Sequence, residues 1–275
     1  MRYWKIKDGI ISLERVLIMG ILNATPDSFS DGGKYTDAHT AAKRAAEMVG
    51  MGADIIDIGG QSTRPGAQKI SEKEEWERLR DVIAVVRQAV SVPISVDTFY
   101  PYVAIKAIEA GASIINDVTG FENEEMCAAA AQTGAGCVVM HCADITENAD
   151  CIHSVGSFFE RKAVKMEQMG IDRACLCFDP GIGFGKTREQ EFELCARIGE
   201  LRTGENPIMA ALSRKRMIGA CLAHDTRPDE RDYGTTAAHA MAIESGADII
   251  RVHNVEAAAQ CIGVMSKLAA AKNSR

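Results

Sequence analysis

Eight short apolar runs in this chain are each followed by side chains that could bind a ligand or carry out chemistry. In the clearest copies a Gly-Ala pair precedes the run, as in Gly246-Ala-Asp-Ile-Ile-Arg251. Carboxylates, amides and cations are unfavourable in an apolar core, so their repeated place after such runs indicates one shared site. The residues at the eight ends are Asn23, Asp57, Asp97, Asn116, Met140, Asp179, Lys215 and Arg251.

The side chains near these ends fall into two chemical groups. Carboxylates accept hydrogen bonds and amides both accept and donate them, so together they suit a flat heterocycle with many donors. This group consists of Asp57, Asp97, Asn116 and Asp179. Cations and hydroxyls suit the oxygens of a phosphate or diphosphate. This group consists of Thr63, Arg64, Lys215, Arg251 and His253. The two groups predict a ligand in which a heterocycle is joined to a phosphate-type group.

The apolar runs have the length and composition of buried β-strands. Each is shorter than about eight residues and is apolar throughout, which is typical of a parallel sheet covered on both faces. Helix-like segments lie between the runs, and several stop at glycine. Eight unbroken β–α alternations predict an α/β protein with a single (β/α)8 barrel, a TIM barrel; a doubly wound open sheet is the alternative. The expected helices are 38–51, 72–90, 102–110, 124–132, 157–169, 189–201, 235–245 and 256–271.

A barrel would bring all eight strand ends to one mouth, where barrel enzymes place their catalytic residues. One polar residue after a strand is more often a helix cap, but eight such positions favour a shared site. Two long loops rich in turn residues, 23–37 and 59–71, follow strands and would lie over the mouth as lids. Residues 1–13 are expected to form a short β-hairpin, with its turn at Asp8-Gly9, that closes the opposite end of the barrel.

The bulk properties limit the class of protein. We expect a single domain over residues 1–275, because no linker or change of composition divides the chain. The net charge of −7 argues against a nucleic-acid partner, and no apolar stretch approaches the roughly 20 residues of a membrane-spanning helix. The first residues lack the apolar part of a signal peptide. The nine cysteines are scattered and odd in number, so we expect a reducing, cytoplasmic location.

Three weaker patterns have simpler interpretations. The run Gly-Ile-Gly-Phe-Gly-Lys at 181–186 resembles a phosphate-binding glycine loop but is not a complete one. We interpret it as a flexible turn that brings the backbone and Phe184 close to a ligand. Cys175 and Cys177 are expected to be buried, inert thiols. A zinc site is disfavoured because the spacing of its candidate ligands matches no standard pattern. These candidates are His141, Cys142, Cys151 and His153.

The motifs, taken together and in order, resemble those of dihydropteroate synthases over nearly the whole chain. The matching segments are 20–33, 57–66, 95–98, 114–118, 178–186, 213–215 and 251–253. The resemblance implies a TIM-barrel transferase of folate biosynthesis. In that reaction (7,8-dihydropterin-6-yl)methyl diphosphate condenses with 4-aminobenzoate, giving 7,8-dihydropteroate and diphosphate. The resemblance also implies Mg²⁺ on the diphosphate, a homodimer, and inhibition by sulfonamides.

The resemblance further assigns roles to individual residues. It implies that the pterin is bound by Asp97, Asn116, Met140, Asp179, Phe184 and Lys215. It implies that the diphosphate is bound by Asn23, Thr63, Arg64, Arg251 and His253, with Asn23 also the magnesium ligand. It implies that 4-aminobenzoate is bound by Phe29, Pro65 and Arg216. The catalytic residues would be Lys215, Asp97, Asp179 and Arg251, whose charges stabilise the departing diphosphate and a pterin cation formed before the amine attacks.

Some positions depart from the family pattern, and two other functions compete with the synthase. The segment 142–148 replaces a usual Pro-Thr-Met stretch, Ala211 replaces a frequent glycine, and Arg216 stands where serine is frequent. One competing function is a pterin-binding methyltransferase acting with a corrinoid protein, which needs neither the Ser-Arg-Lys motif at 213–215 nor the two lid motifs. The other is a non-catalytic paralogue. The synthase is favoured because every residue with a chemical role is present.

Overall fold

Eight parallel strands form a closed barrel in the computed structural model, which describes residues 2–24, 34–62, 67–222 and 224–273, with side chains left out at 34–37 and 273. The strand order is β8-β7-β6-β5-β4-β3-β10-β9, and a parallel bridge between Phe178 and Ile208 connects the two ends of this row. The strands are β3 (Leu17–Asn23), β4 (Ile55–Gly59), β5 (Ile94–Asp97), β6 (Ile114–Asp117), β7 (Gly136–Met140), β8 (Leu176–Asp179), β9 (Met209–Ala210) and β10 (Ile249–Val252). The predicted (β/α)8 barrel is confirmed, and the open sheet was the wrong alternative.

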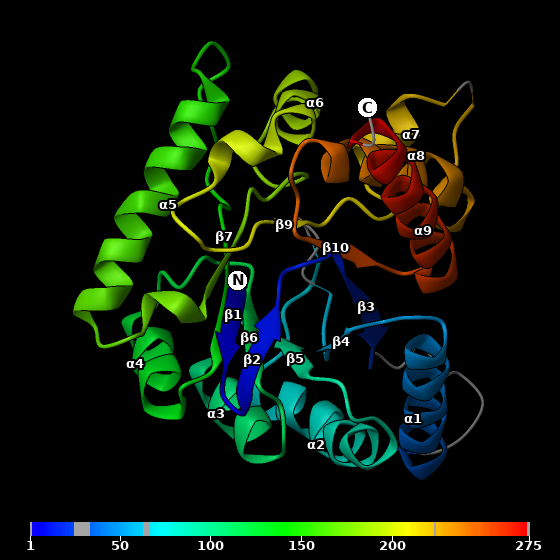
Figure 1. The fold of residues 1–275 in the computed structure, drawn as a ribbon. Helices are drawn as coiled ribbons and strands as arrows, with labels where there is room; N and C mark the ends of the chain where they lie inside the picture. The colour runs from blue at the N-terminus through cyan, green and yellow to red at the C-terminus, as the bar shows by residue number, and fades with distance from the viewer. Residues whose placement is uncertain (1, 25–33, 63–66, 223, 274–275) are drawn as a thin grey trace.

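Helices surround the barrel as an outer ring, from α1 at the lower right of Figure 1 round to α9 at the right. They are α1 (Lys34–Gly50), α2 (Glu72–Ala89), α3 (Pro101–Glu109), α4 (Glu124–Thr133), α5 (Cys151–Gln168), α6 (Arg188–Ala196), α7 (Arg216–Ala220), α8 (Asp232–Glu244) and α9 (Val255–Asn273). The described residues also form the short 3-10 helices η2 (Arg173–Cys175), η3 (Ile198–Leu201) and η4 (Pro228–Arg231).

Helix α2 illustrates how the sequence fixes these elements. The Ser71 side chain caps its first turn by accepting a hydrogen bond from the Glu74 N–H at 3.2 Å. Its buried residues recur at helical spacing, from Leu79 through Val82 and Ile83 to Val86, so one stripe faces the core. Cap and stripe together place the helix where the sequence pattern predicts it.

The N-terminal hairpin closes the end of the barrel opposite the mouth, as predicted. Strand β1 (Tyr3–Ile6) pairs antiparallel with β2 (Gly9–Ser12), and both lie across the end of the barrel that faces the viewer in Figure 1. Trp4 is fully buried, and its Nε1 donates to the Cys175 carbonyl at 2.8 Å. Burying a tryptophan stabilises a fold by roughly 4 kcal/mol. Trp4 joins a cluster of inward-facing residues that includes Met19, Ile55, Ile114, Val138, Cys177, Met209 and Ile249.

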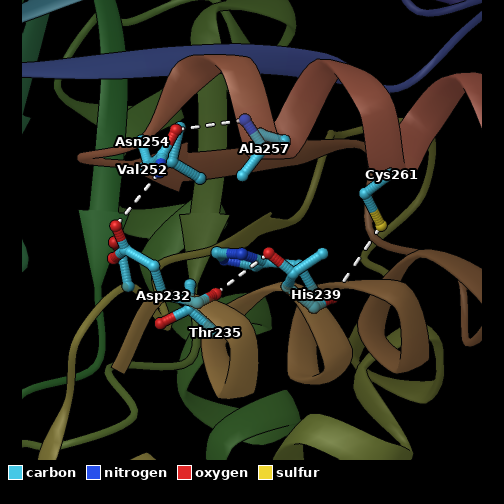
Figure 2. A pocket seen from close by; sticks show the side chains of 10 residues that line it. Asp232, Thr235, His239, Val252, Asn254, Ala257 and Cys261 are labelled. Atoms are coloured by element: carbon cyan, nitrogen blue, oxygen red, sulfur yellow. Dashed lines mark hydrogen bonds between the residues drawn. The ribbon is translucent and has the colours of Figure 1, made fainter. Parts of the chain in front are cut away.

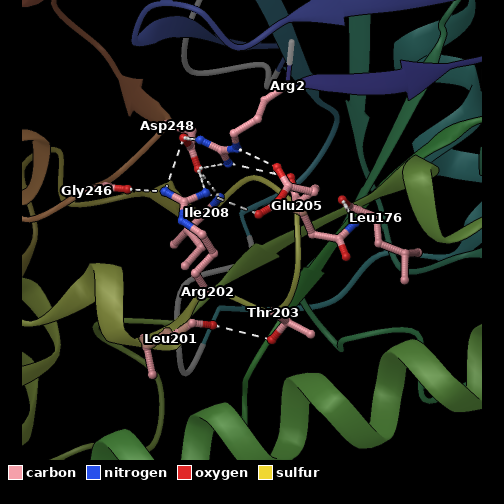
Figure 3. Close-up of polar contacts among 10 residues, drawn as sticks. Arg2, Leu176, Leu201, Arg202, Thr203, Glu205, Ile208, Gly246 and Asp248 are labelled. Carbon is pink, nitrogen blue, oxygen red and sulfur yellow. Dashed lines mark hydrogen bonds and ion pairs between the residues drawn. The ribbon is translucent and has the colours of Figure 1, made fainter.

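Asp248, just before β10, connects the hairpin to the last two strands (Figure 3). Arg2 donates to its Oδ1 and Arg202 to its Oδ2, both at 2.8 Å. The backbone N–H of Ile208 also donates to Oδ2, at 2.9 Å. Because the carboxylate is 7% exposed, these partners compensate for its loss of hydration. This end of the barrel is therefore fastened by charge as well as by apolar packing.

Most expected helices lie within a few residues of their predicted bounds, and the exceptions have local causes. Helix α5 begins at Cys151 rather than 157, because the Asp150 side chain caps it by accepting from the His153 N–H at 2.9 Å. The expected helix 189–201 is divided into α6 and η3, and α7 was not predicted. Cys175 lies in η2 rather than in a strand, although both it and Cys177 are buried as predicted. In the described ranges, no helix is both long enough and apolar enough to span a membrane.

Candidate active site

Four polar side chains at the mouth form one hydrogen-bonded group, which we call the carboxylate–arginine cluster: Asp57 on β4, Asp97 on β5, Asn116 on β6 and Arg251 on β10. Arg251 Nε donates to Asp57 Oδ2 at 2.6 Å. Arg251 Nη2 donates to Asp97 Oδ2 at 2.7 Å and lies 2.6 Å from Asp57 Oδ2. Asn116 Nδ2 donates to the same Asp57 oxygen at 3.2 Å. The structure therefore brings together strand ends that the sequence placed at a common mouth.

The cluster holds two buried carboxylates against a single cation. Burial raises the pKa of Asp97 to about 7, with the negative charge of Asp57 adding to the effect and the Arg251 cation opposing it. For Arg251, burial disfavours the cation, but attraction to Asp57 and Asp97 is larger in sum and raises its pKa above the ordinary value. The Oδ1 atoms of both carboxylates are buried and have no partner among the described residues. The cluster thus retains acceptor capacity for a ligand rich in N–H donors.

Asp179 and Lys215 both contact the loop 181–186. Asp179 is buried, and its Oδ1 accepts from the Gly181 N–H at 2.7 Å. Lys215 Nζ donates to the Ile182 carbonyl and lies 5.1 Å from the centre of the Phe184 ring. Burial raises the pKa of Asp179, while the Lys215 cation opposes that rise. Burial lowers the pKa of Lys215 to about 8, while Asp179 opposes that fall. A carboxylate, a cation and an aromatic face therefore surround the same loop.

Two glycines at positive φ set the backbone around Met140 and His141. Gly181 has a φ of +66°, and a Cβ there would lie 1.9 Å from the His141 carbonyl oxygen. Gly120 has a φ of +70°, and a Cβ there would lie 2.3 Å from the Met140 carbonyl oxygen. Only glycine fits either position. Met140, which is 3% exposed, is therefore held where two loops approach the end of β7.

Lys186, which received no role from the sequence, fastens this loop to the end of β7. Its Nζ donates to the carbonyls of His141 and Phe184, each at 2.7 Å, and lies 2.9 Å from His141 Nδ1. Burial lowers the pKa of Lys186 to about 8 and that of His141 to about 4. The His141 imidazole is therefore neutral at pH 7, and its Nδ1 can accept from the lysine. Over the ranges that the structure describes, no group of three or more His, Cys, Asp or Glu is arranged to hold a metal ion.

The turns after β9 and β10 are joined by side chains. Ser213 Oγ lies 2.9 Å from His253 Nδ1 and accepts from the His253 N–H at 3.2 Å. Arg214 donates to both carboxylate oxygens of Asp232, at 2.7 and 2.9 Å. Asn254 Nδ2 also donates to Asp232, at 3.1 Å. These contacts fix the path of the turn that carries Lys215 after β9 and of the turn that carries His253 after β10.

A small cavity of about 10 Å³ lies behind these turns, between α8 and α9 (Figure 2). That volume holds about one water molecule. Ser213, Asp232 and Asn254 line it together with the fully buried His239. Burial lowers the pKa of His239 to about 4, so this imidazole is neutral and adds no charge behind the site. The cavity is too small to hold a substrate.

The remaining residues predicted for the site differ in how far the structure places them. Asn23, at the end of β3, and Arg216, at the start of α7, are both exposed. Phe29, Thr63, Arg64 and Pro65 lie outside the described residues. The assignments of individual residues to ligands remain predictions. The sequence analysis gave Lys186 no role, and the signal for it was weak, since this lysine only ends a glycine-rich run.

Comparison with known proteins gives one consistent result. Residues 19–253 match the family model described as pterin binding enzyme. The chain is 44% identical over 263 residues to the dihydropteroate synthase of Synechocystis sp., a match that covers 93% of this chain and 91% of the relative. The dihydropteroate synthase of Burkholderia cenocepacia complexed with 7,8-dihydropteroate has a TM-score of 0.90 and 33% identity, covering 100% of this chain and 99% of that one. The Xanthomonas albilineans enzyme with 4-aminobenzoic acid has a TM-score of 0.89 and 38% identity, covering 95% and 96%.

Proposed function

Because this chain belongs to the family of pterin-binding enzymes that includes the dihydropteroate synthases, we propose that it is a transferase of folate biosynthesis. It condenses (7,8-dihydropterin-6-yl)methyl diphosphate with 4-aminobenzoate to give 7,8-dihydropteroate and diphosphate. The observation that carries this proposal is the carboxylate–arginine cluster, in which buried acceptors and one cation meet at the barrel mouth. The relatives' complexes with 7,8-dihydropteroate and 4-aminobenzoic acid support the same reaction.

The pterin is proposed to bind between the cluster and the loop 181–186. Its ring carries several N–H donors, and the unpartnered Oδ1 of Asp97 supports a role in accepting one of them. Asn116 and Asp179 would bind further edges of the ring, and Lys215 would bind an acceptor. Met140 and Phe184 would supply apolar contacts. Burial of Asp97, Asn116 and Asp179 excludes water from these groups and strengthens each of their polar contacts in the transition state.

The diphosphate is proposed to bind at the ends of β3 and β10, where Asn23, Arg251 and His253 lie. Thr63 and Arg64, which lie outside the described residues, are proposed to bind it as well. The Asn23 side chain is exposed at the end of its strand, and its amide oxygen is an acceptable ligand for Mg²⁺, which usually keeps waters and binds few protein groups in addition to substrate phosphates. A bound Mg²⁺ would neutralise charge on the leaving group. Arg251 would stabilise the negative charge that grows as the carbon–oxygen bond breaks.

The amine of 4-aminobenzoate is proposed to attack the resulting pterin cation, with Phe29 and Pro65 walling its site and Arg216 near its carboxylate. Asp97 and Asp179 would stabilise the positive charge on the ring. The exposed position of Arg216 at the first turn of α7 supports contact with an anion. Sulfonamides, which resemble 4-aminobenzoate, would compete for this site.

The decisive assay measures diphosphate release from the pterin diphosphate with and without 4-aminobenzoate. We expect release to require both substrates and Mg²⁺, and calorimetry to show that Mg²⁺ strengthens diphosphate binding in the wild type but not in Asn23→Ala. Pterin binding without turnover would instead indicate a non-catalytic protein. Methyl transfer from methyltetrahydrofolate would indicate the corrinoid-dependent alternative.

The lowered pKa of Lys215 predicts an alkaline limit to activity. Because burial brings that pKa to about 8, the cation is present below pH 8 and is lost as the pH rises through it, whereas an ordinary lysine keeps its proton to about pH 10.4. We expect kcat/KM for the pterin diphosphate to fall above pH 8, since kcat/KM reports groups of the free enzyme. In Lys215→Arg the fall of kcat/KM should begin at a higher pH, and kcat/KM should be lower than in the wild type. Lys186→Arg is the matched control. If the alkaline fall in kcat/KM moved to higher pH only in this variant, the fall could not be assigned to Lys215.

A homodimer is proposed on the basis of exposed apolar residues on α8 and α9. Met241 on α8 is 51% exposed, and Val264 and Leu268 on α9 are 60% and 61% exposed. The two helices pack against each other, and neighbouring exposed apolar side chains often mark an interface.

We expect light scattering with size-exclusion chromatography to give the mass of two chains. The double variant Val264→Glu/Leu268→Glu should give one chain. Val164→Glu, on α5, is the control for adding charge at an exposed valine elsewhere. A wild type that runs as a single chain at micromolar concentration would refute the proposal.

A cytoplasmic location is also proposed, since all nine cysteines are free thiols.

A further inference from the structure

Asp57 is the residue on which the carboxylate–arginine cluster converges, although it has no role in the reaction as proposed above. Its Oδ2 receives three contacts: Arg251 Nε and Nη2, both at 2.6 Å, and Asn116 Nδ2 at 3.2 Å. The residue is fully buried, with no exposed surface. Burying a carboxylate in this position costs several kcal/mol of desolvation. The hydrogen bonds from Arg251 and Asn116 replace the water that it has lost.

The geometry of Arg251 shows what Asp57 does that Asp97 cannot do alone. Asp97 receives only Nη2 of the guanidinium, at 2.7 Å. Asp57 also binds Nε, so the planar group is held along one whole edge and cannot rotate about its contact with Asp97. The third nitrogen, Nη1, takes part in none of these contacts. Arg251 can therefore keep its bonds to the cluster on one edge and offer the opposite edge to an anion.

The geometry of Asn116 gives Asp57 a second function. An asparagine amide has a donor end and an acceptor end of nearly the same shape. Because Asn116 Nδ2 donates to Asp57, the amide oxygen is directed away from the carboxylate, and the amide retains one N–H. An asparagine at position 57 would offer an N–H as well as an oxygen and would therefore weaken this preference. Asp57 therefore sets which end of the Asn116 amide a ring in the pocket meets.

We propose that Asp57 is a positioning residue that couples the two halves of the substrate site: one oxygen orients Asn116 for the pterin ring and Arg251 for the diphosphate. This inference rests on the proposed function, because it takes those two groups as the ligands. In this proposal the acceptor assigned to the pterin is the unpartnered Oδ1 of Asp97, and Asp57 acts through its neighbours. Its effect on each ligand passes through a different neighbour, so the two effects can be separated by experiment.

The test measures two affinities by calorimetry, for 6-hydroxymethylpterin and for inorganic diphosphate with Mg²⁺, in the wild type and in Asp57→Asn. A hydrogen bond to a charged group contributes roughly 1.5–3 kcal/mol. We therefore expect Asp57→Asn to weaken both probes by about 10-fold to 100-fold. Ser95→Ala is the matched control. Ser95 is the neighbour of Asp57 in the register of β4 and β5, is fully buried, and has a hydroxyl without a partner among the described residues. Its removal should change neither affinity more than about 2-fold, because no contact is lost.

Double-mutant cycles then assign the route of each effect. In an Arg251→Gln background, Asp57→Asn should no longer weaken diphosphate binding, while its effect on the pterin probe persists. In an Asn116→Ala background the reverse should hold. A merely structural role for Asp57 would weaken both probes in every background, and that result would overturn the proposal.

Other outcomes are equally informative. If the wild type binds neither probe, the proposed function fails. If the wild type binds both and Asp57→Asn weakens only one, the function stands and the coupling role fails. Thermal melting establishes that each variant is folded. Should Asp57→Asn not fold, Asp57→Glu keeps the charge and shifts the carboxylate by one methylene. It should also weaken both probes, and an effect confined to one of them would refute the inference.

Discussion

Replacing Asp179 by asparagine is expected to lower kcat/KM for the pterin diphosphate about 10⁴-fold. The carboxylate is buried, and Gly181 N–H already fixes its Oδ1 at 2.7 Å. The other oxygen is proposed to accept from the pterin ring. In Asp179→Asn an NH2 group takes the place of one of the two acceptors, so either the loop or the ring meets a donor where it needs an acceptor. Sites that lose a matched buried hydrogen bond discriminate by about 10⁴ to 10⁵.

The measurement is diphosphate release under steady-state conditions, with calorimetry of 6-hydroxymethylpterin to separate binding from turnover. Asp117→Asn is the control, because Asp117 is also a buried carboxylate at a strand end. Its oxygens accept from Thr119 and Phe121 in its own loop, at 2.7 to 2.9 Å. It should lower stability without a selective loss of pterin affinity. An Asp179→Asn enzyme with pterin affinity within tenfold of the wild type would contradict the assignment.

Replacing Arg251 by glutamine is expected to lower both activity and stability. We expect kcat/KM to fall by about 10³ or more, because one removed donor to a developing oxyanion costs 10² to 10³ and this donor is charged. We also expect a loss of about 3 kcal/mol of stability at pH 8, since removing one partner of a buried ion pair leaves an unpaired charge. For a chain of 275 residues that corresponds to a fall of roughly 5 °C in Tm.

The stability loss in Arg251→Gln should depend on pH in a defined direction. The folded-state pKa of Asp97 is already raised to about 7 by burial and by Asp57, and removing the cation raises it further. A carboxyl with a raised pKa is most favourable when protonated, so the variant is least impaired near pH 5 and loses stability as the pH rises toward and beyond 7. Adding Asp97→Asn to the variant should restore part of the Tm at pH 8. If Arg251→Gln had the same Tm as the wild type at pH 8, the Arg251 cation would not be needed to stabilise the cluster.

Much of the fold could be predicted from the sequence because each strand end is marked by residue type. The change from Ile-Ile to Asn116, or from Ile-Ile to Arg251, is visible in the chain itself. The closing hairpin was also predictable, since Asp8-Gly9 separates two short mixed runs. Helix α7 was not, because its five residues are fewer than two turns and leave no periodic pattern. The early start of α5 was missed because Asp150 acts through a single capping bond.

The candidate site was predictable as a location but not as a set of contacts. Residue types placed Asp97, Asn116 and Arg251 at one mouth. No pattern could show that Arg251 binds two carboxylates at once, because Asp57 lies 194 positions away along the chain and the pairing depends on closure of the barrel. Lys186 was missed for a similar reason, since its partner His141 is 45 positions distant. Such long-range pairs are set by strand order, which local residue patterns do not encode.

The pairing of β10 with β3 has a consequence for synthesis on the ribosome. Ile249 lies beside Leu17 in the closed sheet. The first barrel strand to be synthesised, β3, can therefore pair along this edge only after the last strand, β10, has been made. At about 5–20 residues per second, the 194 positions between Asp57 and Arg251 take roughly 10 to 40 s to translate. During that time β3 has an open edge that other chains could pair with, while the acidic strand ends stay hydrated. The barrel therefore closes in the same step in which Arg251 joins the two carboxylates. A nascent chain that stalls before β10 has neither a closed barrel nor a complete site.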